Sequence, residues 1–443
     1  MKKAENLLKT LLLNKIKNKT AILGVVGLGY IGLPLAVEKA KAGFKTIGFD
    51  TQEKRVHWIN EGHNYIKDIL DIDLKKVVDK GLLYATSDFS LIKDVDAICI
   101  CVPTPLDIYQ QPDLSYVKNS TEIVAKHLHV GMLVVLESTT YPGTTEELLK
   151  PILEGESGLK CGKDFFLAFS PERIDPGNLK YKINNTPKVV GGVTPNCTEV
   201  ATYLYRQVLK SEVHIVSSPK VAEMEKIYEN TFRNINIALA NEMAILCHRM
   251  DIDIWEVIEA AKTKPYGFMP FYPGPGIGGH CIPLDPFYLT WKAREYNYHT
   301  RFIELAGEIN RNMPGYIVER ISKILSKKLK KSLNGAKILL LGVAYKKNID
   351  DLRESPALKV IEKLEEEKAI ISYYDPYIQK FINNGKEYKS LNKLTAEELE
   401  EKDIIIITTD HSAVDYEMII KNAKIVFDTR NVIKFKNKKI EKL

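Results

Sequence analysis

The sequence predicts an α/β protein with two doubly wound sheets and, between them, a central helical segment that contains one long helix. Three observations predict this class. Short apolar runs alternate with helical patterns as far as Val216, an unbroken helical pattern extends from Pro219 to about His248, and the alternation resumes after Asn334. A chain of 443 residues is long enough for two or three domains of ordinary size.

Composition places the chain among globular proteins and excludes several other classes. Apolar residues make up 45% of the chain and charged residues 27%, as is typical of soluble domains. No apolar run has the length of a membrane span, and no signal peptide is visible. The six cysteines show neither metal-ligand nor disulfide-framework spacing, so we expect no metal and a reducing, cytoplasmic location.

The positive charge is concentrated at the two ends of the chain. The net charge is +6, but residues 1–20 contribute +5 and residues 434–443 contribute +4, which leaves −3 for the rest. A mildly acidic body with basic ends is not the pattern of a nucleic-acid-binding surface. The first segment is an amphipathic helix pattern that we expect to pack on the protein or a partner subunit rather than insert stably into a membrane. Its apolar residues are Leu7, Leu8, Leu11, Leu12 and Ile16.

The first strand leads into a glycine motif, Gly27-Leu-Gly-Tyr-Ile-Gly32, followed by a helix to Ala42 and a second strand that ends at Asp50. In this context each residue has a separate function. The first glycine allows the turn, Gly29 lets the backbone approach a pyrophosphate, and Gly32 allows close helix packing. Asp50 would accept hydrogen bonds from a ribose diol and repel a 2′-phosphate. The sequence therefore predicts a Rossmann-like domain that binds NAD in preference to NADP.

Further strand patterns indicate that the first sheet is parallel, with ligands bound at the carboxyl ends of its strands. These patterns cover residues 97–102, 133–137, 165–169, 188–190 and 213–216. Three of them end in polar or proline-rich turns: 103–105, which includes Thr104; 138–140, which includes Thr139; and 170–173, which includes Glu172. We expect these turns to lie along one edge of the sheet.

The long central helix pattern begins after Ser218, a suitable N-cap, with Pro219 in the first turn. Lys226 and Asn230 are four residues apart and therefore share one face, although most such pairs on helices are simply solvated. A long helix between two domains is a natural spine and dimer surface.

Residues 272–286 form a glycine-rich loop that contains Cys281 and leads into a probable helix from Phe287 to Glu295. Glycine at this density lets backbone N–H groups approach a ligand or another segment, and the helix N-terminus favours a thiolate. Two interpretations remain open. Cys281 is either a nucleophile or a buried thiol in a tight turn, with Asp285 as N-cap and Pro286 at the first helical position.

A second, smaller α/β sheet is predicted after Asn334. Its strand patterns cover 337–341, 369–374, 404–409 and 425–427, with a turn at 342–347 and a helix at 355–364. Lys346, Arg353 and Arg430 lie at or after strand ends, where cations can bind a diphosphate.

Together, these features suggest a dehydrogenase for a phosphorylated substrate. Oxidation of an alcohol needs only a hydride acceptor and a base, whereas a nucleophilic thiol is useful when an aldehyde must be oxidised further. Thiolate addition gives a thiohemiacetal, loss of hydride gives a thioester, and water releases a carboxylate. Lys226, Asn230, Glu172 and Asp285 are of the types needed to stabilise an oxyanion and to handle protons.

At these residues the chain resembles the UDP-glucose/GDP-mannose dehydrogenase family of nucleotide-sugar 6-dehydrogenases, from about Ile22 to Val432. The motifs that carry the resemblance are 27–32, Ser138-Thr139, Ser170-Pro171-Glu172, Lys226-x-x-x-Asn230, Gly278-Gly279-His280-Cys281 with Asp285, and Tyr345-Lys346 to Arg353-Glu354-Ser355. The resemblance implies oxidation of a sugar C6 alcohol to a uronic acid with two NAD⁺ in succession, and a dimer or an assembly of dimers.

The resemblance also implies roles for individual residues. Cys281 would be the nucleophile, Lys226 and Asn230 would stabilise the oxyanion, and Asp285, Glu172 and Thr139 would arrange water and protons. The implied cofactor-binding residues are Gly27, Gly29, Tyr30, Ile31, Gly32, Asp50, Arg55, Pro103, Thr104, Thr139 and Arg353. The implied substrate-binding residues are Glu172, Arg173, Lys226, Asn230, Tyr272, Gly276, Gly278, Tyr345, Lys346 and Arg430.

We expect four segments: a basic extension at 1–20, an NAD-binding domain at 21–216, a central helical and dimerisation domain at 217–332, and a UDP-sugar-binding domain at 333–443. The stretch 263–293 is most similar to the UDP-N-acetylglucosamine branch of the family. It lacks, between Lys264 and His280, the arginine usual in UDP-glucose enzymes. UDP-N-acetylmannosamine and UDP-glucose stay open as substrates, in a pathway to a surface polysaccharide or glycan. More remote alternatives are a two-electron hydroxyacid dehydrogenase and a non-catalytic nucleotide-sugar binder.

Overall fold

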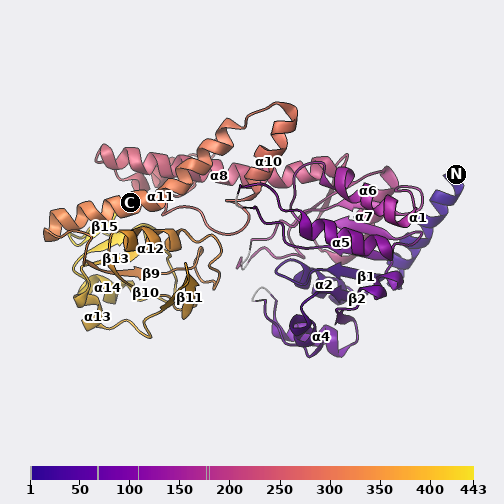
Figure 1. The fold of residues 1–443 in the computed structure, drawn as a ribbon, viewed down its shortest axis with the longest axis horizontal. Coiled ribbons are helices and arrows are strands. Elements are labelled where there is room, and N and C mark those ends of the chain that lie inside the picture. Colours follow the sequence, from indigo (N-terminus) through magenta and orange to yellow (C-terminus); the bar gives the residue numbers. More distant parts are fainter. Residues whose placement is uncertain (1, 67–68, 108, 176, 179) are drawn as a thin grey trace. The chain divides into compact units, whose positions relative to one another are not determined.

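The computed structural model describes residues 2–66, 69–107, 109–175, 177–178 and 180–443. The chain divides into two compact units (Figure 1). The first comprises residues 1–229 and 291–297, and the second comprises residues 230–290 and 298–443. Helix α8 (Pro219–Arg249) begins in the first unit and continues into the second.

The first unit is built on an eight-stranded sheet with strand order β3-β2-β1-β4-β5-β6-β7-β8. Its strands are β1 (Ile22–Val26), β2 (Lys45–Phe49), β3 (Leu83–Thr86), β4 (Ala97–Ile100), β5 (Leu133–Leu136), β6 (Phe166–Phe169), β7 (Lys188–Gly192) and β8 (Val213–Ile215). All neighbours pair in parallel except β6 and β7, which are antiparallel. The expectation of a wholly parallel sheet is therefore wrong at this one pair, because the described residues between Phe169 and Lys188 form no helix and a parallel pair needs a crossover.

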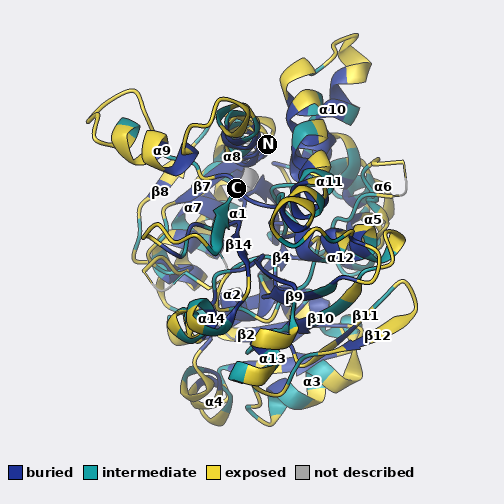
Figure 2. Ribbon diagram, turned by 90° about the vertical axis from the view of Figure 1, so that its left-hand side faces the viewer, coloured by how far each residue is buried: buried dark blue, intermediate teal, exposed yellow. Residues whose placement is uncertain are grey.

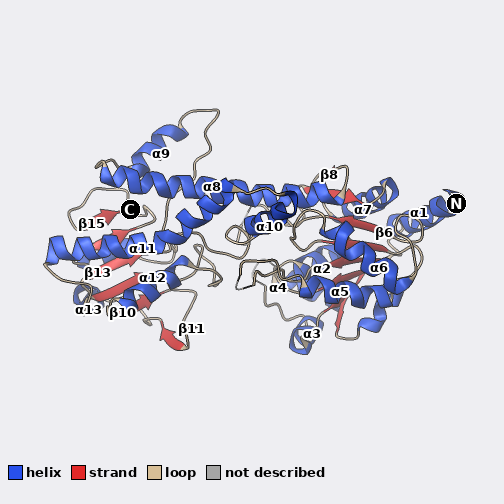
Figure 3. Ribbon diagram, turned by 45° about the horizontal axis from the view of Figure 1, so that its top comes forward, coloured by secondary structure: helices blue, strands red, loops and turns tan. Residues whose placement is uncertain are grey.

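Helices cover both faces of this sheet (Figure 3). They are α1 (Lys2–Lys17), α2 (Gly32–Lys41), α3 (Glu53–Asn60), α4 (Asp71–Asp79), α5 (Ser115–Lys126), α6 (Lys150–Ser157) and α7 (Pro195–Val208), with short η1 (Phe89–Asp94) and η2 (Thr145–Leu149). Two buried apolar clusters fill the spaces between helices and sheet, one on each face. The strands are thus almost wholly buried, as Figure 2 shows in dark blue.

The N-terminal helix packs on the first unit, as expected for its apolar stripe. Leu12 and Ile16 are buried in the same cluster as residues of α7. Lys9 forms an ion pair of 2.9 Å with Glu199, and Lys15 forms one of 2.6 Å with Asp96. No helix of the described residues is both long and apolar enough to cross a membrane.

The second unit contains a five-stranded parallel sheet with strand order β10-β9-β13-β14-β15. The strands are β9 (Lys337–Leu341), β10 (Ile370–Tyr374), β13 (Ile404–Ile407), β14 (Val426–Asp428) and β15 (Ile440–Lys442), and a hairpin is formed by β11 (Lys380–Asn383) and β12 (Lys386–Lys389). Its helices are the second part of α8, α9 (Ile254–Lys262), α11 (Arg301–Leu329), α12 (Pro356–Glu366), α13 (Ala396–Glu401) and α14 (Tyr416–Asn422). Helix α10 (Asp285–Ala293) begins in this unit and is followed by η3 (Arg294–Tyr296).

The predicted fold class is confirmed, and the structure adds elements that the sequence patterns did not reveal. Strand β3, the β11–β12 hairpin and the 29-residue helix α11 were not predicted. Helix α11 contains Pro314, a residue that usually ends or kinks a helix. Helix α10 begins at Asp285, so this residue lies inside the helix and is not its N-cap.

Candidate active site

The glycine loop of the first unit connects β1 to α2 and has the shape of a pyrophosphate cradle. Gly27 has a φ of +86°, which only glycine adopts without strain. A Cβ at Gly32 would lie 1.8 Å from the carbonyl oxygen of Gly27, so the turn and the helix can meet only if this residue is glycine. A Cβ at Gly29 would have no heavy atom within 4 Å. The space above Gly29 and the amides that begin α2 fit a pyrophosphate.

Asp50 ends β2 beside this loop and is 6% exposed. Its Oδ2 accepts a hydrogen bond from the backbone N–H of Leu28 at 2.9 Å, and its Oδ1 accepts one from Gln52 at 2.9 Å. Arg55 lies 3.5 Å from Oδ2. A carboxylate has about four acceptor positions, so Asp50 retains capacity for a ribose diol. Tyr65, which the sequence analysis missed, donates from its hydroxyl to the carbonyl of Leu28 at 2.6 Å and steadies the loop from the other side.

The three predicted turns of the first unit do follow neighbouring parallel strands, β4, β5 and β6. Ser138 joins the first two, because its Oγ accepts from the N–H of Val102 at 2.9 Å and donates to the carbonyl of the same residue at 2.8 Å. This places Thr139 at the carboxyl end of β5, next to the turn that holds Pro103 and Thr104. The prediction that these turns share one edge of the sheet is confirmed.

Glu172 follows β6 and is 5% exposed. Its Oε1 accepts from the backbone N–H groups of Arg173 at 2.7 Å and Ile174 at 2.9 Å, and its Oε2 accepts from Lys188 Nζ at 3.1 Å. Lys226 is buried on α8, in the same unit, with 7% of its surface exposed.

Arg173 makes contacts that the sequence did not suggest. Its guanidinium group is hydrogen-bonded to Glu229 and to the carbonyl of Pro187, and its Nε lies 3.5 Å from Glu225. Burial and the neighbouring Glu229 raise the pKa of Glu225 to about 7. Arg173 therefore bridges the turn after β6 and the first part of α8, and its role in substrate binding remains a prediction.

In the second unit, Cys281 lies one turn before α10. The backbone N–H groups of Leu284 and Asp285 donate to the carbonyl of Cys281 at 3.1 and 2.8 Å, which fixes the thiol-bearing residue to the start of the helix. Asp285 is 4% exposed and accepts from Asn230 Nδ2 at 2.6 Å. The structure thus joins two predicted catalytic residues, Asn230 and Asp285, by a direct hydrogen bond. A third, Cys281, lies four positions before Asp285 in the chain.

A row of asparagines anchors the cysteine loop to the helices beneath it. Asn234 donates to the carbonyl of Ile282 at 2.9 Å, and Asn241 accepts from the N–H of Gly274 at 2.9 Å. Asn310 of α11 donates to the carbonyl of Asn234 at 3.2 Å and accepts from Asn241 at 2.9 Å. The sequence analysis missed these three residues. The sequence could have indicated part of this row, because the spacing of Asn230, Asn234 and Asn241 places them on one face of a helix.

The glycines of the cysteine loop pack closely against the turn after β9. A Cβ at Gly278 would lie 2.4 Å from Cβ of Tyr345, and one at Gly279, where φ is +86°, would lie 3.0 Å from the ring of Tyr345. The N–H of Gly279 donates to the carbonyl of Arg353 at 2.9 Å. A Cβ at Gly274 would lie 2.6 Å from the guanidinium of Arg430. The loop, Tyr345, Arg353 and Arg430 therefore form one cluster within the second unit.

Three further predicted substrate residues lie in the second unit. Tyr272 is 42% exposed, donates to Glu259 of α9 at 2.9 Å and stacks on Trp255. Gly276 has a φ of +133°, and a Cβ there would lie 3.1 Å from Pro356. Lys346 is half-buried in the turn after β9.

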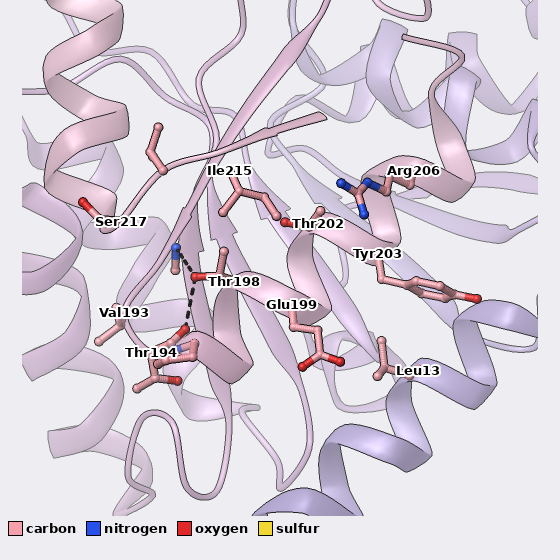
Figure 4. Close-up of a pocket in the computed structure, with 13 residues that line it drawn as sticks. Leu13, Val193, Thr194, Thr198, Glu199, Thr202, Tyr203, Arg206, Ile215 and Ser217 are labelled. Atoms are coloured by element: carbon pink, nitrogen blue, oxygen red, sulfur yellow. Dashed lines mark hydrogen bonds between the residues drawn. The ribbon is translucent and has the colours of Figure 1, made fainter. Parts of the chain in front are cut away.

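A separate cavity of about 630 Å³ lies in the first unit between α7, α1 and the end of β8 (Figure 4). Its lining includes Leu13, Thr194, Thr202, Arg206 and Ile215. Thr198 lies in the wall of this cavity. Its Oγ1 accepts a hydrogen bond from the N–H of Gly192 at 3.1 Å and donates one to the carbonyl of Thr194 at 3.2 Å. None of the predicted site residues lines this cavity, and no described group of His, Cys, Asp and Glu side chains is arranged to hold a metal ion.

Comparison with known proteins agrees with this arrangement. The chain matches the UDP-glucose/GDP-mannose dehydrogenase family in its NAD binding domain (residues 21–209), its central domain (220–312) and its UDP binding domain (339–435). The chain therefore belongs to this family. The family and the relatives support NAD-dependent oxidation of a UDP-sugar at C6, with NAD as cofactor.

Individual relatives cover nearly the whole chain. Protein CapL of Staphylococcus aureus is 40% identical over 93% of this chain and 96% of its own length. UDP-N-acetyl-D-glucosamine 6-dehydrogenase of Pseudomonas aeruginosa is 40% identical over 80% of this chain and 83% of its own length. The solved structure of UDP-D-ManNAc dehydrogenase from Pyrococcus horikoshii has a TM-score of 0.86 and 36% identity, and covers 95% of this chain and 98% of that one.

Proposed function

We propose that this protein oxidises the C6 alcohol of UDP-N-acetyl-D-glucosamine to the uronic acid, with Cys281 holding the sugar between the two oxidations. The observation that carries the proposal is the position of Cys281. Its carbonyl is hydrogen-bonded to the first turn of α10, and Asp285, four residues later, forms a buried pair with Asn230. A tight turn around an inert thiol has no need for an amide–carboxylate pair of this kind beside it.

Each residue contributes a separate part of the chemistry in this proposal. When bound, NAD accepts hydride from the sugar carbon. The Cys281 thiolate adds to the aldehyde carbon, and loss of hydride from the resulting thiohemiacetal leaves a thioester. Lys226 and Asn230 stabilise the negative oxygen. Water then forms a C–O bond as the C–S bond breaks, so the uronate leaves and the thiolate returns. Thr139 and Asp285 orient that water, and Glu172 accepts its proton.

The choice of sugar depends on similarity. The relative from Pseudomonas aeruginosa, named for UDP-N-acetyl-D-glucosamine, supports the proposal, as does the absence of arginine between Lys264 and His280. The relative from Pyrococcus horikoshii, named for UDP-N-acetyl-D-mannosamine, favours that sugar as the second candidate. We propose further that the product supplies a surface polysaccharide or glycan and that the enzyme works in the cytoplasm.

The domain and subunit organisation belongs to the same proposal. We propose an NAD-binding domain at 21–216, a central domain at 217–332 and a UDP-sugar-binding domain at 333–443, after a basic extension at 1–20. In the second unit, α8 exposes Phe232, Leu239 and Leu246, which are seven residues apart and so lie on one side of the helix. This exposed apolar stripe supports a homodimer built on α8.

The substrate is tested by measuring NADH formation with UDP-GlcNAc, UDP-ManNAc, UDP-Glc and UDP-Gal in parallel. The proposal predicts the highest kcat/KM with UDP-GlcNAc. A higher value with UDP-ManNAc would transfer the function to the second candidate. No NADH from any of the four would leave a non-catalytic binder.

A further inference from the structure

A chain of buried polar side chains extends through the first unit behind Glu172. In order, its members are Glu172, Lys188, Glu137, Tyr205, Cys99 and Lys39. They come from the turn after β6, from β7, the end of β5, α7, β4 and α2, and none is more than 5% exposed. Only the first of them has a part in the chemistry proposed above.

Lys188 is the centre of this chain. Its Nζ donates to Glu137 Oε2 at 2.6 Å and to Glu172 Oε2 at 3.1 Å. Burial opposes the charge of Lys188, but the two carboxylates outweigh it and raise the pKa of its ammonium group. Lys188 is therefore a permanent cation between two carboxylates.

Glu137 in turn holds Lys188 in place. It is wholly buried, and its Oε1 accepts from the hydroxyl of Tyr205 at 2.5 Å. Burial would raise the pKa of Glu137, but Lys188 and Lys39 lower it, so this carboxyl is ionised. Burying ions away from water is unfavourable, and apolar side chains would fill the same space without that loss. The arrangement needs a purpose beyond packing.

The Glu137–Lys188 pair limits how the carboxylate of Glu172 can be oriented. Two backbone N–H groups occupy Oε1 and Lys188 occupies part of Oε2, so three of about four acceptor positions are used and one remains for a water molecule. A hydrogen bond between an ammonium group and a carboxylate holds the carboxylate more firmly than a neutral donor does.

We propose that Lys188 is a positioning residue that orients the carboxylate of Glu172, and that Glu137 anchors Lys188. The inference rests on the proposed function, in which Glu172 accepts a proton from the water that releases the uronate. Lys188 touches neither substrate nor cofactor in this role.

Other titratable groups face the pair. Arg173 follows Glu172 but is held by Glu229 and Glu225. On the other side, burial raises the pKa of Tyr205 and of Cys101, so both are neutral. The charge that acts on Glu172 from within the sheet is thus that of Lys188, reduced by Glu137.

The test uses the full-length protein and compares substitutions that remove or keep the donor at position 188. Lys188→Met removes the hydrogen bond to Glu172, so kcat for uronate release should fall by about tenfold or more, with KM for the UDP-sugar and for NAD little changed. Lys188→Arg keeps a cationic donor and should recover part of that loss. Lys41→Met is the matched control, since Lys41 also lies between two carboxylates, Glu38 and Asp73, but contacts neither Glu172 nor Glu137.

Crystal structures of the variants show the position of the Glu172 carboxylate without turnover. If the wild-type protein forms no uronate, the proposed function fails, and the position of Glu172 in Lys188→Met still decides the role of Lys188. A Glu172 carboxylate in its wild-type position in Lys188→Met, or equal losses of kcat in Lys188→Met and Lys41→Met, would overturn the inference. If Lys188→Met does not fold, Glu137→Gln decides alone: a displaced Lys188 and a lower kcat at unchanged KM support the inference, and wild-type kcat refutes it.

Discussion

Asn230 of α8 donates a hydrogen bond from Nδ2 to Oδ2 of Asp285, the first residue of α10, at 2.6 Å, and both side chains are buried. A buried carboxylate that loses its donor costs about 1–3 kcal/mol or more. This bond therefore couples the cysteine loop to the long helix.

Exchanging the two side chains tests whether the position of the charge matters. Asn230→Asp places two carboxylates in contact, and Asp285→Asn removes the charge; each alone should lower the melting temperature and reduce uronate release by about 10²–10⁴-fold. The double exchange restores an amide–carboxylate pair, so the melting temperature should recover while uronate release does not. Asn236→Asp, at a half-buried position on the same helix whose side chain bonds to the carbonyl of Phe232, is the control. Full recovery of activity in the double variant would show that only the hydrogen bond is needed.

The glycine loop predicts different outcomes at two of its glycines. In Gly29→Ala the new methyl group meets no protein atom, so the protein should fold normally but bind NAD at least about tenfold more weakly, a loss of about 1.4 kcal/mol. In Gly32→Ala the methyl group collides with the carbonyl of Gly27, so stability should fall as well. Calorimetric titration with NAD and thermal unfolding separate the two effects. Gly155→Ala, in an open helical position of α6, should change neither NAD affinity nor fold; wild-type NAD affinity in Gly29→Ala would contradict the cradle.

Asp375 predicts a pH dependence for the second unit. Its Oδ2 accepts from the N–H groups of Val343 and Ala344 at 2.8 and 3.2 Å and lies 3.1 Å from His411 Nε2, so it supports the turn that carries Tyr345. Burial acts to raise the pKa of Asp375, but His411 and the backbone N–H groups lower it below its ordinary value of 3.8. This stabilisation is present above the unfolded-state pKa and is lost as the pH falls through the lower, folded-state value.

Asp375→Asn should therefore destabilise the second unit by about 1–3 kcal/mol at neutral pH and by progressively less below about pH 4. The measurement is hydrogen-exchange protection of the β9 amides across this pH range. Glu367→Gln, an exposed carboxylate of the same unit, is the control and should show no effect. A difference between wild type and Asp375→Asn that does not shrink in acid would contradict the assignment.

Those features that depend on neighbouring residues in the sequence were predictable. The turn from Gly27 to Gly32 and the acid at Asp50 belong to one strand–helix–strand unit, and the asparagine and lysine of α8 are one helical turn apart. The antiparallel pair β6–β7 was not predictable in this way. A strand that is buried on both faces is a continuous apolar run in the sequence, whether its neighbour runs parallel or antiparallel to it. Helix α11 was obscured by Pro314 within it.

Features that depend on tertiary contact stayed hidden. The bond between Asn310 and Asn241 joins residues 69 positions apart, and the contact between Lys188 and Glu137 joins residues 51 positions apart. The glycine density at Gly278 predicted close approach to a ligand or to another segment without choosing between them, and its closest neighbour in the second unit is Tyr345. The roles of the individual catalytic residues remain predictions.

The central claim is that Cys281 holds the sugar covalently between two oxidations, and the ratio of NADH formed to uronate released tests it most directly. We expect two NADH for each uronate and no free aldehyde in the wild-type protein, and in Cys281→Ser we expect uronate release to stop or slow greatly while NAD and UDP-sugar still bind. One NADH per turnover with free aldehyde accumulating, or wild-type turnover in Cys281→Ser, would contradict the claim.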